Sequence, residues 1–249
     1  EIKLAGTKPF DEFEEAKALG VQTKPVIIGA FTFLKLLRYT GNKTADDYSN
    51  SVIKVYSELL AEFNKLGAEW IQFDEPYLVH DLTESDIVLF EKLYKEILTA
   101  KQGVKILVQT YFGDVRDCYN NILALDFDGI GLDFTEGKKT VEIIEKNGFA
   151  NDKILFAGVV NGKNIWKNNY KKTLAVLDSL KEKGIETVIG TSCSLLHVPY
   201  TLKMSLNCLR SMLSILLLQK KSLLSLPSLK LCQNVTIITK LFFSQMLHF

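Results

Sequence analysis

Few residues of this 249-residue chain are histidines or cysteines, the types that bind zinc through nitrogen or sulfur or form disulfides. It has three histidines and four cysteines, and the cysteines nowhere show CxxC spacing. They lie far apart, at Cys118, Cys193, Cys208 and Cys232. No secretory signal precedes them, so we expect reduced thiols in a cytoplasmic protein.

Strong net charge and long apolar runs are also missing. The formal net charge is +1, whereas a domain that binds nucleic acid is usually strongly basic. A membrane helix needs about 20 apolar residues, and Lys220, Lys221 and Lys230 interrupt the leucine-rich runs near the C-terminus. We therefore expect neither nucleic acid nor a membrane as a partner.

Acidic residues are absent from one part of the chain. Residues 1–203 hold all 29 acids, whereas residues 204–249 hold no acid, five bases, thirteen leucines and seven serines. We therefore predict a first domain, residues 1–203, and an anomalous tail, residues 204–249. The tail is either a basic surface helix or a segment translated out of frame. Its leucines do not keep to one helical face, which favours the second interpretation.

The first domain alternates short apolar runs with amphipathic helical segments. Three helices are predicted over residues 46–66, 83–99 and 168–183; Gly67 is placed to cap the first, and Thr83 starts the second with a capping box. Apolar strands that alternate with helices predict a parallel sheet covered by helices. The six predicted strands are residues 25–29, 68–73, 105–110, 129–133, 154–160 and 187–191.

Polar residues follow several of these strands at equivalent places, as the catalytic residues of (β/α)8 barrels do. The predicted fold is therefore α/β, a truncated (β/α)8 TIM barrel with about six of its eight strand-helix units. A doubly wound sheet would also accept six strands, but no glycine-rich phosphate loop follows the first one. The edges near Val26 and Thr187 would then be unpaired. The polar residues are Asp74, Glu75, Thr110, Tyr111, Asp133, Asn161 and Ser192 to Ser194.

Three motifs carry a resemblance to a known family. They are EWIQFDEP at residues 69–76, GVVNGKNIW at residues 158–166, and TSCSLLHVP at residues 191–199. In this order they resemble the N-terminal domain of the cobalamin-independent methionine synthases. The resemblance runs from about Lys3 to Lys203, and three motifs in order are far more specific than any one of them.

The resemblance implies that the chain is part of the first barrel of a two-barrel methyltransferase. Such enzymes transfer a methyl group from 5-methyltetrahydropteroyl-polyglutamate to homocysteine, whose thiolate zinc activates. The zinc and most of the substrate site belong to the C-terminal barrel. We therefore expect that second barrel and the folate as partners, and zinc in the full-length enzyme alone. The family's domain begins well before Glu1, so this chain is expected to be a supporting fragment, inactive by itself.

Several residues are candidates for a functional site. Asp74 and Glu75 would act as acid and base or bind a substrate amine, and neighbouring carboxylates shift each other's pKa. We favour the alternative that they hold the barrel rim by bonding loop amides and lysines. Trp166 is a candidate to stack on the pterin or to line the contact with the second barrel, as are Tyr111 and Phe112. Lys163 is a candidate to bind the carboxylate tail, although a solvated lysine is the commoner outcome. His197 is a further substrate-binding candidate, although a bond to a loop carbonyl is the commoner outcome.

A zinc site would need three or four ligands at one point. The resemblance places Cys193 where the catalytic barrel has its last zinc cysteine. Residues 110–112, however, replace the family's His-x-Cys pair and offer no ligand, and Asp133 lies one strand away from a soft partner. We therefore expect no metal here and interpret Cys193 as a buried residue at a relic position.

Two other functions remain open from the residues alone. One is an independent barrel enzyme that uses Asp74, Glu75 and Asp133 on a divalent ion. The other is an interaction module without catalysis. A metal-dependent thermal shift that Asp74→Asn abolishes would favour the enzyme, and co-purification with a separate C-terminal barrel would favour the module.

Overall fold

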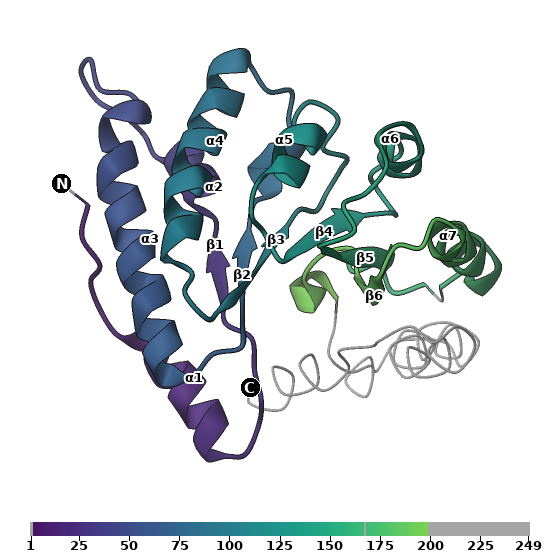
Figure 1. Cartoon of the computed structure of the whole chain (residues 1–249), viewed down its shortest axis with the longest axis horizontal. Coiled ribbons are helices and arrows are strands. Elements are labelled where there is room, and N and C mark those ends of the chain that lie inside the picture. Colours follow the sequence, from purple (N-terminus) through teal and green to yellow (C-terminus); the bar gives the residue numbers. More distant parts are fainter. Residues whose placement is uncertain (1, 167, 199–249) are drawn as a thin grey trace, which may run out of the picture.

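A computed structural model describes residues 2–166 and 168–198, so the tail and the division at residue 203 lie outside the described residues. At the centre is a parallel sheet with the order β1-β2-β3-β4-β5-β6 (Figure 1). All six predicted strands are confirmed. They are β1 (Val26–Ile28), β2 (Trp70–Asp74), β3 (Lys105–Gln109), β4 (Gly129–Asp133), β5 (Ile154–Val160) and β6 (Thr187–Thr191).

Each strand pairs with the next one along the chain, as repeated strand-helix units require. Phe73 is level with Val108, and Val108 with Ile130, so the carboxyl ends of the strands meet at one rim. In the described part of the chain, β1 and β6 form the two edges and do not pair with each other. This open sheet agrees with the predicted truncated barrel.

The helices lie along one face of the sheet and are placed by local signals. Gly67 has φ 79° and ends the first predicted helix, and Thr83 forms the predicted capping box with Asp86. Of the helices in residues 2–166 and 168–198, none combines the length and the apolarity that a membrane span needs. The α-helices are α1 (Lys8–Ala18), α2 (Ala30–Leu36), α3 (Asp46–Leu66), α4 (Glu84–Ile97), α5 (Tyr119–Ala124), α6 (Thr140–Asn147) and α7 (Tyr170–Glu182). The 3-10 turns are η1 (Pro76–Val79), η2 (Leu98–Ala100) and η3 (Leu195–His197).

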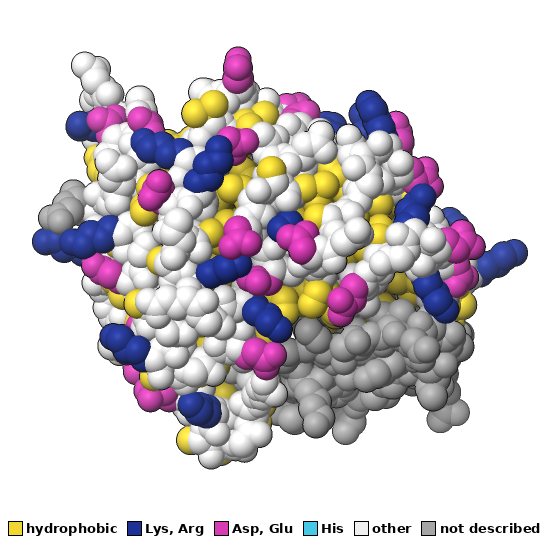
Figure 2. Space-filling model, in the orientation of Figure 1, with side chains coloured by type: hydrophobic (Ala, Val, Ile, Leu, Met, Phe, Trp, Pro, Cys, Tyr) yellow, Lys and Arg dark blue, Asp and Glu magenta, His cyan; other side chains and the backbone are white. Residues whose placement is uncertain are grey.

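Side chains alternate between the two faces of the sheet. Ile71, Phe73 and Val108 belong to the large core cluster beneath the helices, which we call the outer face. The other face, here the inner face, has a small separate cluster. That cluster consists of Trp70, Leu107, Phe156 and Val188. On the surface, acidic and basic side chains are interspersed across the face seen in Figure 2.

Candidate functional site

The end of β2 places two carboxylates at the rim of the sheet. Asp74 is the last residue of the strand, and Pro76 opens η1 two residues later. The amide of Glu75 still donates to the carbonyl of Gln109 on β3, at 2.8 Å. Because successive side chains of a strand point to opposite faces, Asp74 lies on the inner face and Glu75 on the outer face.

Glu75 is completely buried and accepts hydrogen bonds from four donors. The amide of Phe31 donates to Oε1 at 2.9 Å, and the amide of Thr32 donates to Oε2 at 2.7 Å. The hydroxyls of Thr32 and Tyr94 add one bond each. The carboxylate thus binds the first turn of α2 to α4 and the end of β2.

Burial raises the pKa of Glu75 to about 7, although the four donors favour the charged form and oppose this rise. The tight fit also explains a glycine in the turn after β1. A Cβ on Gly29 would lie 2.2 Å from the Glu75 carboxyl carbon, so any larger residue would displace the carboxylate. Gly29 and Glu75 therefore form one structural unit.

Asp74 belongs to a line of hydrogen-bonded side chains on the inner face. The buried Lys24 ammonium donates to the Gln72 side-chain oxygen, and the Gln72 amide group donates to Asp74 Oδ1 at 2.7 Å. The Tyr111 side chain also interacts with Asp74, and this interaction opposes the rise of the Asp74 pKa. We call Lys24, Gln72, Asp74 and Tyr111 the inner relay. Gln72 fits between a cation and an anion because its amide has an acceptor at one end and a donor at the other.

The electrostatics of the two acids differ from the expectation in two ways. Burial, rather than mutual repulsion, raises the pKa of Asp74, and Gln72, Tyr111 and Lys24 oppose that rise. The two carboxylates project from opposite faces, so the expected mutual shift was wrong. Glu75 accepts main-chain amides of the first turn of α2 and not of a loop, and its other partners are hydroxyls and not lysines.

Asp133 at the end of β4 is a second buried carboxylate that receives main-chain amides. Its Oδ1 accepts from the Thr135 amide at 2.7 Å, the Thr135 hydroxyl at 2.9 Å and the Glu136 amide at 2.9 Å. Its Oδ2 accepts from the Phe112 amide at 3.0 Å. Asp133 therefore binds the loop after its own strand and the loop after β3.

The described residues do not fit a metal ion. No three His, Cys, Asp or Glu residues among them come together as a metal site would require. Glu75 and Asp133 use their oxygens on hydrogen-bond donors, so Asp74, Glu75 and Asp133 do not form the divalent-ion site of the alternative enzyme. Burial raises the pKa of the Cys193 thiol, which disfavours the thiolate that zinc binds. Cys193 is buried, as expected, and its interpretation as a relic position stays a prediction.

The three candidate substrate-binding residues follow the last two strands. Trp166 is 60% exposed after β5, while the Lys163 ammonium pairs with Glu136 at 2.8 Å and lies 4.4 Å from the centre of the Phe112 ring. The backbone of His197 closes η3, and its side chain lies outside the described part of the chain. Their roles in binding stay predictions.

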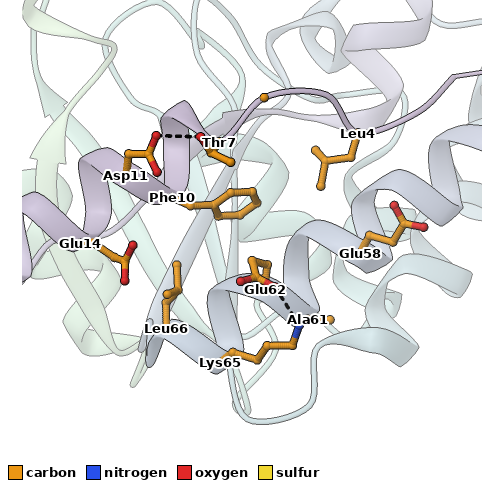
Figure 3. A pocket seen from close by; sticks show the side chains of 11 residues that line it. Leu4, Thr7, Phe10, Asp11, Glu14, Glu58, Ala61, Glu62, Lys65 and Leu66 are labelled. Carbon is orange, nitrogen blue, oxygen red and sulfur yellow. Dashed lines mark hydrogen bonds and ion pairs between the residues drawn. The ribbon is translucent and has the colours of Figure 1, made fainter.

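A groove of about 530 Å³ lies away from this rim. Figure 3 shows Phe10 and Leu66 lining it between α1 and the second half of α3. Since α3 ends just before β2 begins, this groove is at the amino ends of the strands, opposite Asp74 and Glu75. The strand-end residues and the groove are therefore separate features.

Sequence reasoning did not identify the partners that define these sites. Thr32 and Tyr94 bind Glu75 from two different helices, and Lys24 lies two residues before β1, outside any predicted strand. One signal was present: Gln72 and Asp74 alternate along β2, so both had to face the same side of the sheet. Two polar residues on a buried face indicate a polar partner there.

Comparisons with known proteins show which family the chain resembles. Residues 1–184 match the family model described as "Cobalamin-independent synthase, N-terminal domain". A 5-methyltetrahydropteroyltriglutamate–homocysteine methyltransferase from Streptococcus thermophilus is 54% identical over 200 residues, which cover 80% of this chain and 26% of that protein. The Campylobacter jejuni enzyme of the same name is 46% identical over 229 residues, which cover 92% of this chain and 30% of that protein.

A solved structure supports the fold. A B12-independent methionine synthase from Shewanella superposes with a TM-score of 0.60 at 14% identity, covering 89% of this chain and 66% of that one. The chain spans under a third of the length of the curated relatives named above. The family model covers most of the chain and includes the first two motifs, while the third, at residues 191–199, lies beyond its end. The chain therefore belongs to the cobalamin-independent methionine synthase family, matching its N-terminal domain.

Proposed function

We propose that this chain is the folate-side barrel segment of an enzyme that methylates homocysteine from 5-methyltetrahydropteroyl-polyglutamate to make methionine. Its role is to support a second, catalytic barrel and to help hold the folate. By itself it is inactive. The proposal rests on membership of the family and on the share of the relatives that the chain spans.

The supporting role is inferred from the hydrogen bonds that the strand-end carboxylates accept. Glu75 and Asp133 both bind main-chain amides, which leaves neither of them free for acid-base chemistry. Asp74 is held by Gln72 and Tyr111 in the inner relay. Carboxylates arranged in this way stabilise a rim, and the zinc that activates homocysteine would belong to the C-terminal barrel.

The rim also has apolar side chains on which a second barrel can pack. Phe112, Trp166 and Leu196 follow β3, β5 and β6, and they are 37%, 60% and 89% exposed. Large apolar groups gathered at one end of a barrel favour a protein interface. We propose the C-terminal barrel of the full-length protein as the partner there, in a cytoplasmic enzyme.

A chimera tests the proposal. Residues 1–198 of this chain would replace the matching segment of the Streptococcus thermophilus enzyme, which is 54% identical over 200 residues. We expect the folded chimera to form methionine at a rate within about tenfold of the parent, which corresponds to about 1.4 kcal/mol of transition-state stabilisation. A folded, zinc-loaded chimera without methyl transfer would contradict the proposal. The unmodified parent is the control.

A further inference from the structure

One rim residue has a backbone conformation that its side chain disfavours. Phe112, in the loop after β3, has φ 76°, in the left-handed region. Bulky side chains rarely adopt this conformation, because it brings Cβ close to the backbone. Such a residue persists where the surrounding structure holds it.

Asp133 is placed to hold it. The Asp133 carboxylate is 1% exposed and accepts the Phe112 amide at 3.0 Å through Oδ2. Hydrogen bonds to a buried, charged acceptor are among the strong ones in proteins. Asp133 itself is fixed, because its carbonyl accepts from the buried Thr140 hydroxyl at 2.7 Å and three donors hold Oδ1.

The conformation of Phe112 has a consequence for the neighbouring loops. Its ring lies edge-on to Tyr111, with ring centres 4.9 Å apart. The Lys163 ammonium of the loop after β5 lies 4.4 Å from the Phe112 ring centre and pairs with Glu136 of the loop after β4. Three successive rim loops therefore meet around this one strained residue.

We propose that Asp133 is a conformational latch, which holds Phe112 in a strained left-handed conformation and so keeps the loops after β3, β4 and β5 together. When the Phe112 amide leaves Asp133, the strain is released, and Phe112 relaxes to negative φ. Its ring then moves off Lys163, and the rim gains a second, open arrangement. This inference does not depend on the proposed catalytic role of the full-length enzyme.

The variant Asp133→Asn separates the latch from the other contacts of this side chain. Two amides and a hydroxyl donate to Oδ1, so the asparagine carbonyl oxygen takes that place. Its NH2 group then faces the Phe112 amide, where donor meets donor and the bond is lost. We expect amide hydrogen exchange of residues 111–113 in the full chain to become roughly tenfold to hundredfold faster.

The matched control introduces Asp133→Asn into a chain that already carries Phe112→Gly. Glycine adopts φ near 76° without strain, so this background has none to release. In that background the amide of residue 112 loses the same bond, so the comparison uses the amides of residues 163 and 164 in the loop after β5, which donate to Asn161. We expect Asp133→Asn to accelerate their exchange clearly in the parent but less than about threefold in the glycine background, since no strain remains there to be released. Equal acceleration in both backgrounds would overturn the latch, and so would unchanged exchange in Asp133→Asn alone.

A second measurement covers the case in which Asp133→Asn unfolds the chain. Phe112→Gly keeps Asp133 and removes the strain, so we expect exchange of residues 111–113 to stay within about threefold of the parent or to slow. Exchange more than tenfold faster in this variant would show that packing of the ring, and not the Asp133 bond, sets the loop. That result would overturn the proposal.

Discussion

The two faces of the parallel sheet differ in how they are covered and in what they hold. On the outer face, helices bury a large apolar cluster, and the carboxylate of Glu75 lies beside it with four donors. On the inner face, four apolar residues form a small cluster, and the inner relay joins Lys24 to Asp74. Asp74 and Glu75 are neighbours in sequence, but the strand places them on different faces, so each takes its properties from a different environment.

The largest expected effect tests how strongly each face stabilises the fold. Phe73 on the outer face is fully buried between the rings of Tyr56 and Tyr94, at centre distances of 5.5 and 6.2 Å. We expect Phe73→Ala to lower the free energy of unfolding by about 3–5 kcal/mol. The matched change Phe156→Ala on the inner face should cost roughly 1–3 kcal/mol, because fewer groups pack around it. Urea denaturation measures both, and equal losses would remove the distinction between the faces.

The second prediction concerns the pH dependence of Glu75. Its pKa is about 7 in the fold and 4.5 in the reference state, so the folded chain binds the proton more tightly. The stabilisation from this group is complete below pH 4.5 and is lost as the pH rises through 7. The parent should therefore lose roughly 3 kcal/mol relative to Glu75→Gln over that interval. A difference between the two proteins that stays constant from pH 4 to 8 would refute this assignment.

A third change probes the fit between the first turn of α2 and Glu75. Gly29→Ala places a Cβ 2.2 Å from the Glu75 carboxyl carbon, so the carboxylate must move and lose donors. We expect a loss of about 1–3 kcal/mol in unfolding free energy. Gly103→Ala is the control, because its Cβ would meet Asn64 at 3.4 Å, and it should change stability by less than about 1 kcal/mol. Thermal unfolding of the two variants measures this difference. A Gly29→Ala variant as stable as the parent would argue against Gly29 and Glu75 forming one structural unit.

The smallest expected effect is on the inner relay. Burial lowers the pKa of Lys24 to about 8, so the charged lysine is costly to bury at pH 7. Lys24→Met removes this cost and the attraction to Asp74 together, and we expect a net change within about 1 kcal/mol. Between pH 8 and 10.5 the folded chain binds fewer protons at Lys24 than the unfolded chain does, because the pKa is about 8 in the fold and 10.5 in the reference state. The parent should therefore gain stability relative to this variant as the pH rises through that interval. If Lys24→Met lowered the free energy of unfolding by several kcal/mol at pH 7, the buried lysine would be a net stabilising group.

The sequence predicted those parts of the fold that depend on local pattern. Six apolar runs became six strands, Gly67 ended its helix, and Thr83 formed its capping box. These features depend on residues close together in the chain, where periodicity and capping chemistry are readable.

The partners of the site residues could not be predicted in the same way. Tyr94 is 19 residues from Glu75, Thr32 is 43 residues from it, and Lys24 is 48 residues from Gln72. Only the folded chain decides which distant hydroxyl or amine reaches a buried carboxylate. The left-handed conformation of Phe112 had no local signal, since glycine or asparagine is the usual residue there.

The central claim is that the strand-end carboxylates of this chain stabilise structure and do not catalyse methyl transfer. The most direct test incubates the purified chain with zinc, homocysteine and 5-methyltetrahydropteroyltriglutamate and measures methionine by mass spectrometry. We predict no methionine above the protein-free control, while the full-length Streptococcus thermophilus relative forms it under the same conditions. Turnover by this chain that Asp74→Asn abolishes would contradict the account.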